Sequence, residues 1–320
     1  MKLLLLLSLV FFFSACTKQS DIPRLVIAAE GGKLAIAEAG GTLLWQHPIT
    51  QVHDIQLLDN GNILVNNGWP KIMELDLAGN IVWEYDSSKT EGYNGEKIEI
   101  HAFRRLANGN TMVAESGISR IVEVDPQGKL VSSIPLQVAK SNSHTDTRLV
   151  RKLDNGDYLV SHEGEERVAR YNPSGEIVWN FEVPLFGKAK AKGHGPDAYG
   201  AKTFSAIVLE NGNYLISTGN GHSVLEVTPD KEIVWHLSQN ELPGVTLAWV
   251  TTLQELPNGN FIIGNCHAGP DNPQIIEVNR AKELVWSWKN VIDFPKNALS
   301  NSLVVEGETA KSLGERISAL

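Results

Sequence analysis

Cysteine is scarce in this chain, whose 320 residues contain only Cys16 and Cys266. Cys16 belongs to an N-terminal segment that we interpret below as a secretion signal, so Cys266 has no partner and we expect no intrachain disulfide. We interpret Cys266 as a small buried or half-buried residue that fills space in the core. Stability must then come mainly from apolar burial, for which a chain that is 42% hydrophobic has ample material.

Long basic runs and helical periodicity are also scarce. The formal net charge is −9, which makes duplex nucleic acid an unlikely partner because its phosphates repel an acidic surface. Alternating apolar runs separated by Gly and Asn predict an all-β chain. No phosphate-binding loop, serine nucleophile elbow or paired-carboxylate motif stands out.

The N-terminus has the pattern of a secretion signal. Lys2 precedes an apolar run over residues 3–13, which is too short for a membrane-spanning helix of about 20 residues. The ending Ser14-Ala15-Cys16 resembles a bacterial lipobox in which Phe13 replaces the usual leucine. This resemblance implies a signal peptide over 1–15, lipidation of Cys16, a linker over 16–23 and anchoring in the bacterial cell envelope, with Thr17 favouring the outer membrane. Ordinary secretion without a lipid is the alternative.

A phrase of about eight residues recurs five times, first as LLDNGNILV at 57–65. Its glycines stand at 61, 109, 156, 212 and 259, at spacings of 48, 47, 56 and 47 residues. Asn-Gly between two strand-like runs predicts a hairpin with a type I′ turn. In a second recurring pattern, such as EVDPQG followed by KLV, a third strand ends in a turn and a fourth strand follows. Each unit therefore has four strands, and four-stranded units at this spacing predict a β-propeller.

The two ends of the chain supply a sixth unit. Residues 24–46 end in the same pattern but lack a first strand, and residues 298–308 resemble a first strand with nothing after it. We therefore predict a six-bladed propeller over 24–308, closed by pairing of its terminal segments, with a short tail over 309–320. Tryptophans that recur on the fourth strands, Trp45, Trp83, Trp179, Trp235 and Trp286, are interpreted as structural packing.

Strand order assigns the loops to two ends of the propeller. The Asn-Gly turns are short and uniform, whereas the loops between strands two and three and the links between blades vary, and function favours variable loops on a rigid scaffold. His53 and His101 each lie seven residues before the turn asparagine, at the start of the first strand of their units. Arg148 has the equivalent position in the next unit, and His144 lies four residues upstream of Arg148. We propose these four as catalytic or anion-binding residues. The alternative is that they merely line a wet channel.

Further residues at the variable end are candidates for ligand binding: Trp69, His162, His194, His222, Trp249 and His267. Trp69 and Trp249 each have two interpretations: the ring stacks on a ligand, or it simply packs its own loop. The long link over 184–202 carries four lysines and His194, and is either an anion-attracting lid or a mobile loop. Zinc or copper would accept these imidazoles and is a further alternative, although no HxH or HExxH spacing supports a metal site.

The repeat unit resembles the PQQ-like repeats of bacterial β-propellers, and HDIQLLDNGNILV (53–65) and IVEVDPQGKLV (121–131) carry the likeness most closely to the arylsulfotransferase-type branch. That branch implies sulfuryl transfer through a histidine nucleophile, with His53, His101, His144 and Arg148 in matching positions. Phe204 and Thr251 stand where further histidines are expected, and the extra N-terminal domain is missing.

PQQ itself is not expected, since quinone dehydrogenases have larger propellers, and no other cofactor is predicted. Related assembly lipoproteins of the outer membrane use such propellers as protein-binding scaffolds. A ligand-binding or partner-binding envelope lipoprotein is thus the first hypothesis, and a transferase the second.

Overall fold

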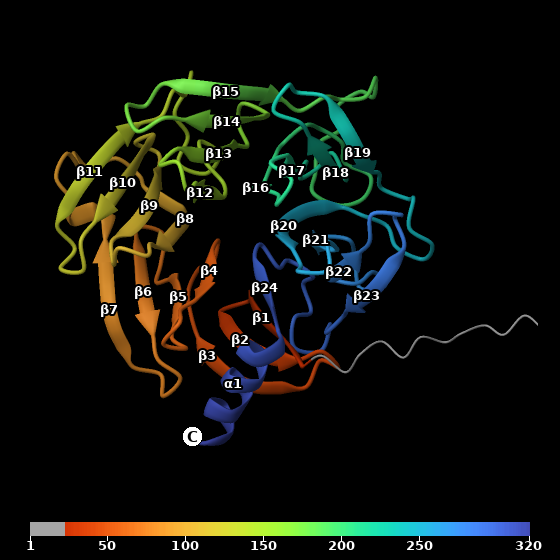
Figure 1. Ribbon diagram of the computed structural model, residues 1–320, viewed down its shortest axis with the longest axis horizontal. Coiled ribbons are helices and arrows are strands. Elements are labelled where there is room, and N and C mark those ends of the chain that lie inside the picture. Colours follow the sequence, from red (N-terminus) through yellow and green to blue (C-terminus); the bar gives the residue numbers. More distant parts are fainter. Residues whose placement is uncertain (1–22) are drawn as a thin grey trace, which may run out of the picture.

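The computed structural model describes residues 23–320. The predicted signal peptide, Cys16 and all but the last residue of the predicted linker lie outside the described residues. Six four-stranded antiparallel sheets are arranged as blades around a central axis (Figure 1). The all-β class, the propeller and the count of six blades are thus confirmed. No helix within residues 23–320 is long and apolar enough to cross a membrane.

Each blade runs from a strand near the axis to a strand at the rim (Figure 1). Blade 1 contains β4 (Ile55–Leu57), β5 (Ile63–Asn66), β6 (Lys71–Leu75) and β7 (Ile81–Asp86). Blade 2 contains β8 (Glu99–Arg105), β9 (Thr111–Ser116), β10 (Arg120–Val124) and β11 (Leu130–Pro135). Blade 3 contains β12 (Val150–Lys152), β13 (Tyr158–His162), β14 (Arg167–Tyr171) and β15 (Ile177–Glu182). A short 3-10 helix, Ser87–Lys89, lies in the link between blades 1 and 2.

The remaining three blades follow the same plan. Blade 4 contains β16 (Ala206–Val208), β17 (Tyr214–Ser217), β18 (Val224–Val227) and β19 (Ile233–Leu237). Blade 5 contains β20 (Trp249–Glu255), β21 (Phe261–Cys266), β22 (Ile275–Val278) and β23 (Leu284–Trp288). Blade 6 contains β24 (Ser302–Glu306), β1 (Arg24–Glu30), β2 (Lys33–Glu38) and β3 (Leu43–Pro48).

The two ends of the described chain close the ring as predicted. In blade 6 the C-terminal strand β24 is the innermost strand and pairs antiparallel with β1, so that Leu25 faces Val305. This pairing satisfies backbone groups that would otherwise form an open sheet edge. Closure therefore gives all six blades a neighbour on both sides.

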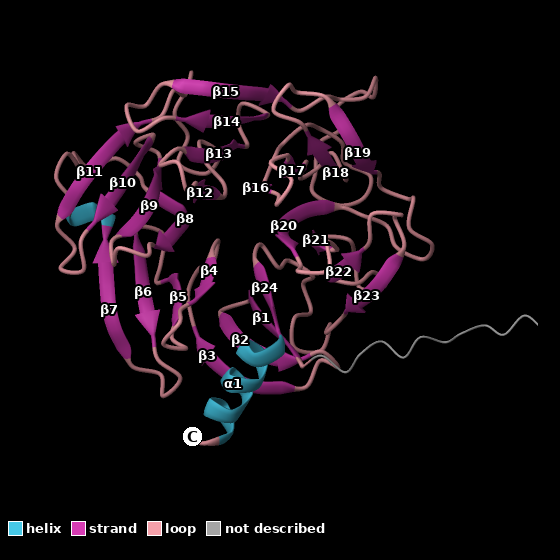
Figure 2. Ribbon diagram, in the orientation of Figure 1, coloured by secondary structure: helices cyan, strands magenta, loops and turns pink. Residues whose placement is uncertain are grey.

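A C-terminal helix, α1 (Gly307–Ser318), occupies most of the segment that the sequence analysis describes only as a tail. Ala310 and Leu313 are buried against the core between blades 6 and 1, with Ile317 packed beside them. These positions follow the spacing of one helical face. Figure 2 shows α1 as the one long helix beside the strands of blade 6.

The Asn-Gly turns are hairpins, but they are not of the predicted type I′. In the first, Gly61 has a φ of 81° while Asn60 is absent from the residues with positive φ. The Gly61 N–H donates to the Leu58 carbonyl, and the Leu58 N–H donates to the Asn62 carbonyl. This is a three-residue loop in which glycine takes the left-handed position. Asn60 contributes through its side chain, whose Oδ1 accepts a bond from the Asn62 N–H at 2.9 Å.

The repeat tryptophans join neighbouring blades. In four of the five, the indole N–H donates to a carbonyl in the turn between strands three and four of the next blade. The pairs are Trp45 with Leu77, Trp83 with Pro126, Trp179 with Pro229 and Trp235 with Arg280, at 2.8–3.0 Å. The motif therefore serves the scaffold, in agreement with the structural interpretation of these residues.

Candidate functional site

Three histidine rings meet at the histidine-rich end of the propeller. The ring centroids of His53 and His101 are 4.5 Å apart, and those of His101 and His144 are 5.6 Å apart. His53 and His144 are separated by 6.3 Å. Their shared register and the position of His144 upstream of Arg148 had predicted that these residues lie near one another. We refer to His53, Trp69, Glu99, His101, His144 and Arg148 together as the His101 cluster.

A β-bulge positions His101. The pairing of β8 with β9 shifts between Ile100 and Ala102, so His101 is the extra residue of the bulged strand. A bulge turns a side chain away from the regular alternation, and such irregularities are common beside functional sites. His101 is consequently buried, with 1% of its surface exposed.

Asn66 ties His53 to the same place. The buried Asn66 side chain accepts a hydrogen bond from the His53 N–H at 2.9 Å and donates one to the Ile100 carbonyl at 2.9 Å. It therefore links the entry to β4 with the bulged strand β8. This rigid support is what a preorganised site requires.

The loop that carries His144 is held by the buried carboxylate of Asp146. Asp146 accepts hydrogen bonds from Ser119 Oγ and Ser141 Oγ at 2.9 and 2.8 Å. The Asn142 side chain in turn accepts a bond from the His144 N–H at 2.9 Å. His144 thus stands on a braced loop, although 53% of its side chain is exposed.

Trp69 forms one wall of the cluster. Its ring stacks on His53 with centroids 5.1 Å apart, and it meets His101 and His144 edge-on at 6.0 and 6.1 Å. The Trp69 carbonyl also accepts a hydrogen bond from the Ile100 N–H. The indole is therefore packed against all three histidines of the cluster.

Burial and neighbouring cations keep the inner histidines unprotonated. Burial lowers the pKa of His53 well below its usual value, and His101 and Arg148 lower it further. The pKa of His101 falls to about 4, again mainly through burial and then through Arg148. Neutral imidazoles at physiological pH can accept a proton, attack as nucleophiles or bind a metal ion.

Arg148 is the cation that lowers the pKa of His53 and His101, and it belongs to an ion-pair network with Glu163 and Lys202. Its Nε donates to the buried Glu163 carboxylate, whose other oxygen accepts a bond from Lys202 at 3.0 Å. Within residues 23–320, Nη1 of Arg148 and Nδ1 of His53 are buried without a hydrogen-bond partner. Such atoms cost free energy unless something binds them.

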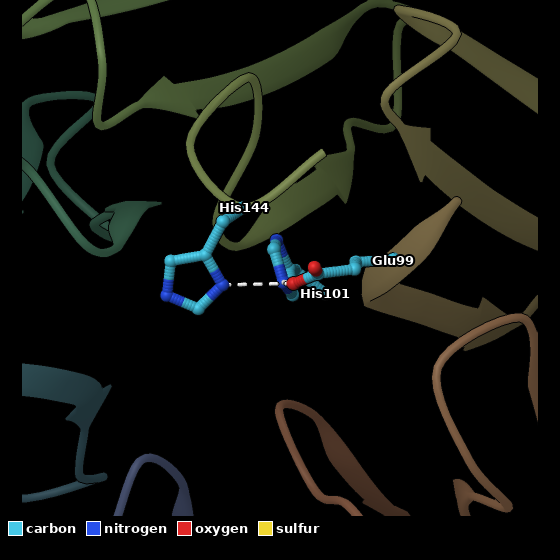
Figure 3. A group of neighbouring side chains, drawn as sticks. All are labelled: Glu99, His101 and His144. Carbon is cyan, nitrogen blue, oxygen red and sulfur yellow. Dashed lines mark hydrogen bonds and ion pairs between the residues drawn. The ribbon is translucent and has the colours of Figure 1, made fainter. Parts of the chain in front are cut away.

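Glu99 is a member of the cluster that the sequence analysis missed. Its Oε2 lies 2.8 Å from His144 Nδ1 and 3.3 Å from His101 Nε2 (Figure 3). Burial raises the pKa of this carboxyl, but its hydrogen-bond partners, Lys97 and His144 among them, outweigh burial and hold the pKa below its usual value. The available signal was the position of Glu99 only two residues before His101 on the same strand.

A second group, which we call the His194 cluster, consists of His194, Trp249 and His267. The His194 ring lies 4.7 Å from Trp249 and 5.2 Å from His267. His194 comes from the link over 184–202, in which Ala191 pairs with Tyr199. Trp249 itself is buried, and His194 and Lys202 of this link both contact its ring. Three of the residues predicted for ligand binding thus form a second group, which includes none of the histidines of the His101 cluster.

His162 and His222 are placed differently from the other candidates. His162 lies 2.6 Å from the Asp146 carbonyl and 2.9 Å from the Tyr171 hydroxyl. His222 contacts the carbonyls of Ala248 and Ala198. Both rings are buried and both nitrogens of each are hydrogen-bonded, so these two side chains brace loops rather than face a ligand.

Of the residues in these two clusters, only His53 lines one of the hollows described next. A hollow of about 730 Å³ lies at the Asn-Gly end between blades 3 and 4, where it is lined by residues such as Arg151, Arg170 and Tyr214. The hollow that reaches His53 is smaller, about 270 Å³. The larger hollow is formed by the uniform scaffold turns, so we assign function by the convergence of titratable groups instead.

Comparison with known proteins supports the repeat family and the fold. A family model described as outer membrane protein assembly factor BamB matches residues 17–154, which is less than half of the chain. No curated protein matches. A solved protein of unknown function from Bacteroides caccae is 22% identical with a TM-score of 0.72, covering 89% of this chain and 99% of that one.

Virginiamycin B lyase from Staphylococcus aureus is more distant. It is 13% identical with a TM-score of 0.55, covering 90% of this chain and 95% of that one. At such identities both structures establish the fold alone. The recurring strand motifs, the six closed blades and the family-model match identify the chain as a β-propeller built from PQQ-like repeats.

Proposed function

We propose that the protein is a lipid-anchored component of the bacterial cell envelope whose propeller binds a small organic anion at the His101 cluster. The observation that carries the binding site is the convergence of His53, His101 and His144 beside Trp69. The scaffold does not need this convergence, because the repeat turns and tryptophans close the blades without it. Titratable groups gathered in this way are typical of functional sites.

The chemistry of the cluster favours an anion with a flat part. Arg148 Nη1 is a buried donor without a partner among the described residues, and a guanidinium binds oxyanions well. Trp69 offers an aromatic face. The exposed His144 provides a polar edge toward solvent.

The envelope location rests on the N-terminal sequence and on the family model. The apolar run before Ser14-Ala15-Cys16 supports lipidation of Cys16. The match to a family described as an outer-membrane assembly factor supports the envelope more generally. Mass spectrometry of the mature N-terminus tests this part, which is overturned if Cys16 is unmodified or absent from the N-terminus.

The binding site is tested by thermal denaturation with a panel of aryl carboxylates, sulfates and phosphates. We expect at least one to raise the melting temperature of the full-length chain in saturable fashion. Trp69→Ala and Arg148→Gln should abolish the shift, whereas Phe186→Leu, at an exposed position on the link, should retain it. The site is refuted if no anion shifts the wild type or if both cluster variants respond like the wild type.

Sulfuryl transfer is the second candidate function, and the state of His53 favours it. Its pKa is low and its Nδ1 is unpartnered among the described residues, so a ring nitrogen has a lone pair for attack. In such a step the nitrogen bonds to sulfur while the ester S–O bond breaks and the phenolate leaves. An acceptor phenol then attacks sulfur, restores the imidazole and yields the new ester, and its proton passes to solvent or base.

Transfer from p-nitrophenyl sulfate to phenol tests this candidate. We expect release of p-nitrophenol that depends on phenol and falls at least about 100-fold in His53→Ala. His236→Ala, which changes a histidine in the rim strand β19, is the matched control. Absence of turnover in the wild type removes the transferase but leaves the binding proposal standing.

A further inference from the structure

We propose that Glu99, His101 and His144 form a binding site for a divalent first-row transition metal ion, with zinc as the best fit. One potential ligand atom from each residue lies within 4.8 Å of the other two (Figure 3). In a tetrahedral site with metal–ligand bonds of about 2.0–2.1 Å, neighbouring ligand atoms are roughly 3.3 Å apart. The measured 2.8 and 3.3 Å separations around Glu99 Oε2 need only small adjustments.

The hydrogen bond on the far side of His101 fixes which nitrogen faces the site. Nδ1 of His101 lies 2.7 Å from the Thr147 carbonyl, and a carbonyl can only accept, so Nδ1 carries the proton. Nε2 of the neutral ring therefore presents a lone pair toward the Glu99 carboxylate. Two electron-rich atoms face each other at 3.3 Å, and a cation between them would convert this repulsion into two bonds.

This hydrogen bond is also the usual support of a metal-binding histidine. Metal-ligating imidazoles commonly donate their other N–H to a carbonyl or carboxylate, which fixes the tautomer and the ring orientation. Nε2 of His101 is buried and has no hydrogen-bond partner within residues 23–320. Burial and an unpartnered nitrogen together distinguish His101 from the buried His162, whose two nitrogens are both bonded.

The two oxygens of Glu99 are divided between different tasks. Oε1 accepts bonds from Lys97 Nζ at 2.5 Å and from Ser143 Oγ at 3.2 Å. Oε2 accepts a hydrogen bond from His144 Nδ1 at 2.8 Å and faces His101 Nε2 at 3.3 Å, so a bound metal ion would take the place of the His144 proton. This arrangement suits a carboxylate that binds a metal through one oxygen while the other is held by the protein.

The donor set selects the kind of metal. Two imidazole nitrogens and one carboxylate oxygen suit zinc, copper, nickel, cobalt or iron, whereas magnesium and calcium prefer oxygen ligands. Three protein ligands leave a tetrahedral ion one position for water or a bound molecule, and the exposure of His144 connects that position with solvent. The spacing Glu-x-His with a distant second histidine matches none of the motifs sought in the sequence.

Metal titration of the full-length chain in detergent, after removal of metals with a chelator, tests the inference. We expect one equivalent of Zn²⁺ per chain with micromolar or tighter affinity, and Co²⁺ to give the visible absorption of a four-coordinate or five-coordinate ion. Mg²⁺ at the same concentration should not compete. His144→Ala, at an exposed position, should retain the fold and lose at least about 100-fold in affinity.

The variants separate this site from other sources of binding. Glu99→Gln should weaken Zn²⁺ to a similar extent, whereas His194→Ala and His47→Ala should leave it unchanged. The inference is overturned if the wild type binds no Zn²⁺, if His144→Ala and Glu99→Gln bind it like the wild type, or if His194→Ala abolishes binding. The site does not depend on the organic anion: it survives if no anion binds, and the anion proposal survives if no metal does.

Discussion

Arg24 and Glu306 lie 282 residues apart in the sequence, and Nε of Arg24 donates a hydrogen bond to Oε1 of Glu306 at 2.7 Å. The bond spans the pairing of β1 with β24, where the first and last strands of the described chain close the ring. Val304 and Val305 of β24 are buried in this pairing. The ring is therefore completed by pairing between the first and last strands of the described chain.

Ending the chain after Asn301 should open the propeller. Loss of β24 and α1 exposes the edge of β1 and several apolar side chains worth about 1.5–3 kcal/mol each, a large part of the 5–15 kcal/mol that holds a typical domain folded. We expect aggregation or a melting temperature lowered by more than 10 °C, measured by circular dichroism and light scattering. Ending after Glu306, which removes only α1, should cost less. Equal effects of the two truncations contradict the closure argument.

Asp54 should be needed to hold two arginines together. Its buried carboxylate lies 2.9 Å from Arg104 Nη1 and 2.9 Å from Arg151 Nη1. Asp54→Asn leaves the two cations facing each other, so we expect a loss of about 3–5 kcal/mol in urea denaturation. Asp59→Asn, at an exposed turn position, should change stability by less than about 0.5 kcal/mol. Adding Arg151→Gln to Asp54→Asn should recover part of the loss, and failure to do so argues against charge as the cause.

Lys231→Gly should stabilise the protein. Lys231 has a φ of 71° in a turn where other repeats carry glycine, such as Gly128. A left-handed conformation costs an L-residue about 1–2 kcal/mol, partly offset by the greater freedom of glycine in the unfolded chain. We expect a net gain of about 0.5–1 kcal/mol in chemical denaturation. Lys231→Ala keeps the strain and serves as the control; an equal gain from alanine shows that backbone strain is not the reason.

Stability should fall as the pH falls from about 6.5 to about 4, and His162 should cause part of the fall. Burial lowers the pKa of His162 from 6.5 to about 4, with Arg167 adding to the shift and Asp146 and Glu165 opposing it. The unfolded chain therefore binds more protons in this interval, so the contribution is full above pH 6.5 and is lost toward pH 4. The loss amounts to roughly 3 kcal/mol.

Urea denaturation at several pH values measures this dependence. His162→Gln should be less stable than the wild type at pH 7.5, because it disturbs the bonds to Asp146 and Tyr171. Its stability should nevertheless decline less between pH 6.5 and 4. Parallel pH profiles for the two proteins assign the dependence to other groups.

The sequence predicted more of the scaffold than of the site. Spacing and turn residues predicted six blades and their closure, because hairpin chemistry repeats locally in every unit. Register predicted that His53 and His101 lie near each other, since equivalent residues of neighbouring inner strands face the same axis. The turn type was wrong, because Asn60 acts through its side chain and leaves the left-handed position to Gly61.

What the sequence by itself determined was the periodic part of the molecule, in which each blade obeys the same short-range rules. Only the tertiary structure decided the state of individual polar groups. The bulge at His101 and the carboxylate of Glu99 in front of it lie on the same strand β8, whereas the Thr147 carbonyl behind His101 comes from a link 46 residues further along the chain. Both rings are buried, but Nε2 of His101 has no hydrogen-bond partner among the described residues, whereas both nitrogens of His162 are hydrogen-bonded. Neither property is encoded in the spacing of the histidines.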